Sequence, residues 1–222
     1  DRSYFSYSEA VQFIGYGAIG GSQISGLFRS NHDLSDEKSK NLEFGHQIKR
    51  SEWNLKVAVF YRWDNDLVDW AYVGRGARSA ENMDMETLGL EIFAAREWNQ
   101  IKTIVSYTYL EKDEDYGNLT IDGSFYALNY PKHRATLSMV WDPLDSIEIR
   151  IDNEWREQRE NLLREGPDHS LNSHIAASYY TTQTKDLEVF IAYDKPWDED
   201  FQDIPGTPGR GDQFSLGGTY SW

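Results

Sequence analysis

The chain contains no cysteine among its 222 residues, which excludes disulfide frameworks and cysteine-based metal or nucleophile sites. It also has no run approaching the ~20 consecutive apolar residues that a membrane helix needs, so a helical membrane protein is excluded. Basic residues are few beside acidic ones, and the net charge is −15. Nucleic acid is therefore not expected as a partner, because binding its phosphates calls for a basic face.

Aromatic residues, by contrast, are abundant in an otherwise polar chain. They make up 14% of the residues while the mean hydropathy is −0.68. A membrane β-barrel combines these two properties, because its strands alternate lipid-facing and lumen-facing residues while Tyr, Phe and Trp gather at the two bilayer interfaces.

Alternation with a period of two recurs along the chain, most clearly in residues 53–63 and 146–156. In both segments nearly all odd positions are apolar or aromatic and most even positions are polar or charged. A soluble β-sandwich can show the same alternation. Aromatic residues at the ends of the apolar faces, together with links that alternate between short and long, favour the membrane barrel.

We therefore predict an all-β fold, a transmembrane antiparallel β-barrel to which this chain contributes about ten strands. The predicted strands are residues 1–8, 41–50, 53–63, 85–95, 100–111, 131–142, 146–157, 170–181, 187–194 and 213–222. Short links are expected at 50–52, 96–99, 142–145 and 182–186, and long ones at 9–40, 64–84, 112–130, 158–169 and 195–212.

The alternation also assigns residues to the two faces of the sheet. Expected to face lipid are Leu55, Val57, Val59, Leu137, Met139, Ile149, Ile151, Val189, Ile191 and Leu216. Expected to face the lumen are Glu43, Lys56, Arg62, Glu91, Lys102, Arg134, Glu148, Arg150, Asp152, Glu154, Arg156 and Glu188. A wall carrying both charge signs suits cross-strand ion pairs and contacts with a lumen-filling domain.

Residues 31–45, N-H-D-L-S-D-E-K-S-K-N-L-E-F-G, resemble the N-P-x-L-x-P-E-x-x-x-x-x-E-x-G signature of TonB-dependent receptors. The matching residues are Asn31, Leu34, Glu37, Glu43 and Gly45. His32 and Asp36 stand where the family usually has proline, a change expected to loosen the loop without altering the following strand.

Further similarities follow in the family's order. The runs D-L-V-D-W at 66–70 and T-L-G-L-E at 87–91 resemble those of vitamin B12-type receptors, and Y-P-K-H-R at 130–134 matches the next strand pair. These runs supply the further motif residues Asp69, Trp70, Gly89, Glu91, Pro131 and Arg134. After P-G-T-P-G-R at 205–210, the last strand resembles the terminal signal that the barrel-assembly machinery reads, through Phe214, Leu216, Tyr220 and Trp222.

This resemblance implies that residues 1–222 are the C-terminal portion of a barrel of about 22 strands in the outer membrane of a Gram-negative bacterium, surrounded by lipid and lipopolysaccharide. The plug domain, which contacts TonB, and the earlier strands would come from a companion chain or segment. Residues 4–7 and 214–222 would pair with its strands, because an unpaired edge is not tolerated in lipid. Closure of this chain on itself as a small barrel is the alternative.

The implied function is TonB-energised import of a scarce nutrient chelate, with a cobalamin-like corrinoid slightly ahead of a ferric siderophore. No catalytic residue, cofactor or resident metal is expected. Substrate contacts are expected from the outer loops, at Phe13, Tyr16, Phe28, Trp197, Phe201 and Arg210. These same loop residues could instead serve loop-loop packing.

Two other functions stay open on the sequence. A small-barrel hydrolase would use His174 with Asp152 and Glu154, and a porin would pass small solutes without gating. The acidic runs 113–115 and 198–200 are interpreted as solvated loop tips, with divalent-cation binding as the alternative.

Overall fold

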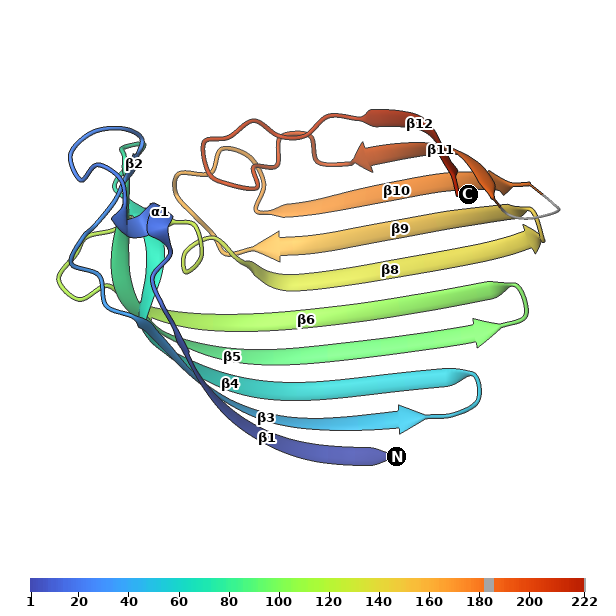
Figure 1. Ribbon diagram of the computed structural model, residues 1–222, viewed down its shortest axis with the longest axis horizontal. Helices are drawn as coiled ribbons and strands as arrows, with labels where there is room; N and C mark the ends of the chain where they lie inside the picture. Colours follow the sequence, from blue (N-terminus) through green and yellow to red (C-terminus); the bar gives the residue numbers. More distant parts are fainter. Residues whose placement is uncertain (182–185, 222) are drawn as a thin grey trace.

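The computed structural model describes residues 1–181 and 186–221, and it confirms an all-β antiparallel fold. One curved sheet runs in the order β1-β3-β4-β5-β6-β8-β9-β10-β11-β12 (Figure 1). Its strands are β1 Arg2–Gln12, β3 Glu37–Lys49, β4 Trp53–Tyr72, β5 Arg78–Trp98, β6 Ile101–Asp115, β8 Pro131–Leu144, β9 Ile147–Gln158, β10 His169–Tyr180, β11 Leu187–Pro196 and β12 Gln213–Tyr220. The short elements are α1 Tyr16–Ile19, β2 Phe28–Arg29 and β7 Gly123–Ser124. No helix among the described residues is long and apolar enough to cross a membrane.

The expected long link at residues 64–84 is wrong. These residues belong mostly to β4 and β5, which form one long hairpin joined by residues 73–77. Likewise β1 continues to Gln12 and β3 begins at Glu37, inside the segment 9–40 that we expected to be a link. In the β4–β5 hairpin the sequence pattern fails because a β-bulge interrupts the alternation on which it relies.

The bulge lies in β4, where the pairing with β5 shifts between Asp64 and Leu67. Asp66 adopts φ 57°, a left-handed conformation that Asp and Asn tolerate better than most residues. Since one extra residue reverses which side chains face which way, the odd residues of β4 beyond the bulge share a face with Asp64. Asp69 is thereby placed on the inner side of the hairpin, where its side chain is buried.

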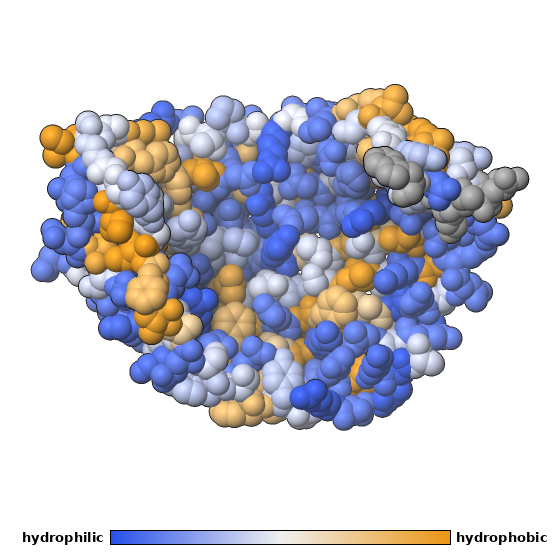
Figure 2. All heavy atoms as spheres, viewed as in Figure 1, coloured by the Kyte–Doolittle hydropathy of each residue, from blue (hydrophilic) through white to orange (hydrophobic). Residues whose placement is uncertain are grey.

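The two faces of the sheet are confirmed as different in character. Pairing registers carry Glu43, Arg62, Glu91, Arg134 and Glu154 across successive strands on one face. That face is hollowed and mostly hydrophilic in its hollow (Figure 2). The residues expected to face lipid lie on the opposite face, where each is partly or largely exposed and none belongs to the buried core. No second sheet packs on them among the described residues.

Glycines on the inner face are matched with aromatic rings from the neighbouring strand. Gly45 pairs with Tyr4, Gly89 with Phe60, and Gly217 with Phe190. A Cβ atom at any of the three glycines would overlap the ring of its partner. Two of these glycines belong to the family motif, so the motif has a packing explanation: the ring lies across the space that the absent side chain leaves.

We therefore expect Gly89→Val to impair barrel assembly, because the new side chain must displace the Phe60 ring from its site. The destabilisation should be about 1–3 kcal/mol, the usual cost of overpacking. Heat-modifiability of the protein on gel electrophoresis, measured at increasing temperature, would report it. Gly211→Ala is the control, since a Cβ there meets nothing within 4 Å, and equal behaviour of both variants would contradict the expectation.

β1 and β12 are the two edge strands of the sheet. These are the strands that we expect to pair with a companion chain or segment. Residues 2–12 of β1 are all exposed. On β12, Phe214, Leu216 and Tyr220 are exposed on a single face, while Trp222 lies outside the described residues, as does most of the short link expected at 182–186. The pairing of these edges with another chain stays a prediction.

Candidate functional site: the loop-bearing end of the sheet

The long links gather at one end of the sheet, opposite the short turns (Figure 1). There the tip of the β4–β5 hairpin is paired on both sides by segments of other links. β2, from the β1–β3 link, pairs with β5 at Arg78 and Ser79. β7, from the β6–β8 link, pairs with β4 at Ala71 and Tyr72. The two links are therefore held by the hairpin and by each other, since Phe28 of β2 also packs edge-on against Phe125.

Asp69 fixes the β6–β8 link to β4. Its carboxylate accepts hydrogen bonds from the backbone N–H groups of Phe125 (3.2 Å), Tyr126 (3.1 Å) and Ala127 (2.9 Å), and from the Tyr116 hydroxyl (2.9 Å). Burial of the Tyr116 phenol, followed by the nearby Asp69 charge, raises the pKa of Tyr116 far above its ordinary value. Tyr116 therefore stays a neutral donor at physiological pH.

Residues of the N-P-x-L-x-P-E resemblance hold the β1–β3 link against the same bulge. The Glu37 carboxylate accepts the Val68 N–H at 3.1 Å, just beyond the bulge. The Asn82 side chain accepts the Ser35 N–H at 2.7 Å and donates to the Asp66 carbonyl oxygen. Glu37 of the motif and Asn82 of β5 thus hold the bulged hairpin against the end of the link that precedes β3.

Arg164, in the β9–β10 link, joins three links at a single buried guanidinium group. Its side chain is 1% exposed. It donates to the Asn129 side-chain oxygen (2.9 Å) of the β6–β8 link, to the Gln202 carbonyl (3.2 Å) of the β11–β12 link, and within its own link to the Arg159 carbonyl (2.9 Å) and to Asp168. An arginine bonded at all three guanidinium nitrogens makes the three links one connected unit.

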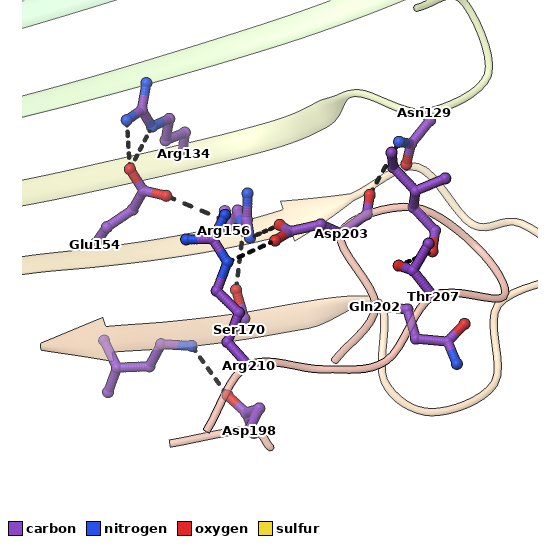
Figure 3. A network of polar contacts seen from close by, with 12 residues as sticks. Asn129, Arg134, Glu154, Arg156, Ser170, Asp198, Gln202, Asp203, Thr207 and Arg210 are labelled. Atoms are coloured by element: carbon purple, nitrogen blue, oxygen red, sulfur yellow. Dashed lines mark hydrogen bonds and ion pairs between the residues drawn. The ribbon is translucent and has the colours of Figure 1, made fainter. Parts of the chain in front are cut away.

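A second ion-pair network attaches the β11–β12 link to the wall (Figure 3). Asp203 bonds Arg156 of β9 and lies 3.3 Å from Arg210 Nε, while Arg156 also bonds Ser170 of β10 at 3.1 Å. Phe201 lies beneath the Arg156 guanidinium group, whose carbon is 4.7 Å from the ring centroid. Cation–π contacts of this kind stabilise the attachment further.

Two glycines allow close backbone approaches, one between two of these links and one within the β11–β12 link. Gly166 has φ 102°, and a Cβ there would lie 2.6 Å from the Asp200 carbonyl oxygen across the β9–β10 and β11–β12 links. Gly209 approaches the carbonyl oxygen of Glu199 more closely still. The links over β8–β12 therefore contact one another closely.

Below these links the inner face forms a cavity of about 1050 Å³, lined by β8, β9, β10 and β11 and by Arg210. Its charges are paired: Arg150 bonds Asp152 along β9 at 2.6 Å, His174 Nδ1 lies 2.8 Å from Asp194 on the neighbouring strand, and Glu154 bonds Arg134 of β8. A second cavity of about 640 Å³ lies on the same face over β4–β6, beneath residues 15–18.

The family model described as TonB dependent receptor-like, beta-barrel matches residues 2–200. The chain belongs to the TonB-dependent receptor family. Among solved structures, the copper transporter OprC superposes with a TM-score of 0.68 at 15% identity, over 99% of this chain and 37% of that one. The FrpB iron transporter of Neisseria meningitidis gives 0.63 at 14% identity, over 87% and 32%. The ferric-catecholate import receptor Fiu of E. coli K12 gives 0.61 at 16% identity, over 98% and 32%.

At these identities the likeness shows the fold alone. The chain spans about a third of the length of each of these three proteins. No curated protein matches the sequence closely enough to add a second comparison.

The residues predicted to contact the substrate differ in their exposure and in their contacts. Phe13 and Tyr16 are 80% and 81% exposed on the β1–β3 link, and Arg210 lines the larger cavity. Phe28 packs edge-on against Trp70 at 5.2 Å between ring centroids. Phe201 is only 6% exposed and serves packing in this structure.

Trp197 lies toward the apolar face. Its indole N–H donates to Ser173 Oγ at 2.9 Å, and Ser173 shares its face with Ile175, not with the inner wall. Of the predicted substrate-contacting residues, Arg210 and Phe201 lie in one network, because Asp203 pairs with Arg210 and with Arg156, which lies over Phe201. Phe13 and Tyr16 lie on a different link, between β1 and β3.

The three residues that a small-barrel hydrolase would use, His174, Asp152 and Glu154, do not bond one another. His174 and Asp152 are register neighbours, yet the imidazole bonds Asp194, while Asp152 and Glu154 bond arginines. The acidic runs are likewise partly engaged, with Glu114 bonded to Arg159 at 2.5 Å and Asp198 to the Leu171 N–H at 2.9 Å. Within residues 1–181 and 186–221, no group of three or more His, Asp or Glu side chains could hold a metal ion.

Sequence reasoning missed Arg164, Asp203 and Asn129. Each is a polar residue in a link without regular alternation, so no local pattern distinguishes it from a solvated loop residue. The neighbouring Gly166-Pro167 and Pro205-Gly206 pairs are typical of turns, but such pairs do not indicate which residues the turns bring together.

Proposed function

We propose that this chain forms part of the barrel wall and the recognition loops of an outer-membrane receptor that imports a scarce nutrient chelate with energy supplied through TonB. The observation that carries the proposal is the single curved sheet with a charged inner wall, an apolar outer face and all long links at one end. Such a wall suits a barrel filled by a plug in a Gram-negative outer membrane.

The plug and the remaining strands belong, in this proposal, to a companion chain or segment that pairs with the edges of β1 and β12. Two facts support this. The chain spans about a third of comparable receptors, and bare strand edges in hydrocarbon leave backbone groups without partners. Purification in mild detergent should therefore recover a polypeptide carrying the plug, whereas a lone heat-modifiable monomer would contradict it.

For the substrate, we propose a cobalamin-like corrinoid slightly ahead of a ferric siderophore. The resemblance of residues 66–70 and 87–91 to vitamin B12-type receptors supports the first. The neighbouring structures are described as iron, copper and ferric-catecholate transporters, which supports metal chelates as the wider class.

Uptake in cells that produce the complete receptor would test the function. We expect uptake of a corrinoid or a ferric chelate that disappears when TonB is removed and is not replaced by diffusion of small sugars. Ungated sugar diffusion would favour the porin alternative, and uptake of neither chelate class would overturn the proposal. A strain without the receptor sets the background.

A further inference from the structure

The smaller of the two cavities described above, of about 640 Å³, lies on the inner face at the loop-bearing end and is lined by several elements. Its floor comes from β4, β5 and β6, and its roof from residues 15–18 and Tyr126. Phe60, Trp70 and Met85 give it apolar surface suited to the body of an organic ligand. Asp64 is the most buried charged group among the lining residues.

Asp64 has one oxygen atom in use and one free. Its side chain is 1% exposed. Oδ1 accepts hydrogen bonds from Arg62 Nε at 2.7 Å and from the Ser39 hydroxyl, whereas Oδ2 is buried and has no hydrogen-bond partner. A buried carboxylate oxygen without a donor is unfavourable, so the site is improved when the cavity wall shifts enough for a donor from outside the chain to reach Oδ2.

The two cations beside the cavity are already engaged. Arg62 bonds Asp64 and Ser39, and Lys112 donates to the Tyr126 carbonyl at 3.1 Å with its ammonium group 4.7 Å from the centre of the Tyr130 ring. The group left over is therefore an acceptor. A ligand that complements it must bring an N–H, an O–H or a positive charge.

The net charge of the loop-bearing end also favours a ligand that is not negatively charged. Most of the chain's net charge of −15 falls in residues 13–36, 64–84, 111–130, 156–169 and 194–213, the segments at the loop-bearing end. Acidic surroundings raise the local concentration of cations and lower that of anions. A chelate carrying several negative charges is repelled from this mouth.

We propose that this receptor selects a chelate of zero or positive net charge, whose donor-bearing edge enters the cavity over β4–β6 and binds Asp64. The inference rests on the proposed import function and narrows its substrate class. It favours a neutral corrinoid with peripheral amides, or a cationic ferric tris-hydroxamate, over a trianionic ferric tris-catecholate.

Binding of these three chelates to the complete receptor tests the inference. The corrinoid or the tris-hydroxamate should bind at least about 100-fold more tightly than the tris-catecholate. Asp64→Asn should weaken binding of the tris-hydroxamate by about 10–100-fold, because the amide removes the charge and can present N–H where Oδ2 stood. Asp66→Asn removes one carboxylate of the same rim outside the cavity lining and should change it less than about threefold.

Each other outcome is informative. Tightest binding of the tris-catecholate, or equal effects of the two variants, would overturn the inference while leaving the import function standing; binding and uptake of none of the three would reject both. If Asp64→Asn fails to assemble, a salt titration of the unaltered receptor decides. Affinity for the cationic chelate should fall as ionic strength rises, and an unchanged or rising affinity would contradict the inference.

Discussion

Asp69→Ala is expected to release residues 116–130 from the β4–β5 hairpin. The substitution leaves the N–H groups of residues 125–127 and the Tyr116 hydroxyl without their acceptor. Since these groups lie in a buried setting and bond a charged acceptor, local opening should become easier by on the order of 3–5 kcal/mol. Limited proteolysis of the receptor in native membranes should show cleavage within 116–130 at least about 100-fold faster.

Asp113→Ala provides the matched control, because Asp113 is exposed near the end of β6 at the start of the same link. Its removal should change the cleavage rate less than about twofold. Asp69→Asn keeps one acceptor oxygen and should fall between the two. Equal protection of the link in Asp69→Ala and in the unaltered protein would show that Asp69 is not what holds it.

The second large effect is expected from Arg164→Met, which keeps the length of the side chain and removes all its donors. Asn129, Gln202 and Asp168 then lose a buried partner. The β6–β8, β9–β10 and β11–β12 links should move separately, and ligand affinity should fall by about 10–100-fold because a pre-organised surface becomes flexible.

A label on the β11–β12 link would measure this movement. The chain has no cysteine, and a side chain at residue 211 meets nothing within 4 Å, so Gly211→Cys accepts a spin label. The label should become markedly more mobile in Arg164→Met. Arg75→Ala breaks an ion pair to the same β9–β10 link, with Glu165, in which both side chains are exposed; it should cost less than about 1 kcal/mol and leave the label unchanged.

The sequence predicted those structural features that depend on neighbouring residues better than those that depend on contacts between residues far apart in the chain. The ten long strands, their antiparallel order and the two faces followed from alternation between neighbouring residues, as in β9, where Ile149 and Ile151 oppose Arg150 and Asp152. Alternation is local, so it survives without knowledge of the fold. It failed at residues 64–84, where one bulged residue, Asp66, reverses the pattern.

The structure of the loop-bearing end could not be predicted from alternation. Asp69 was recognised only as part of a motif, and Arg164 not at all, because Asp69 bonds groups of another link 47 to 58 positions away and Arg164 bonds the two other links 35 and 38 positions away. Whether a charged residue is solvated or buried there depends on which links the registers of the sheet bring together.

The sequence by itself thus determined an antiparallel sheet with one apolar and one charged face, and the family to which it belongs. The tertiary structure alone decided which polar residues hold the links together, that Phe201 is buried, and that Asp64 keeps an unbonded oxygen beside a cavity. The physical reason is that strand faces are set by period-two geometry along the chain, whereas burial and hydrogen bonding in the links arise from contacts between distant segments.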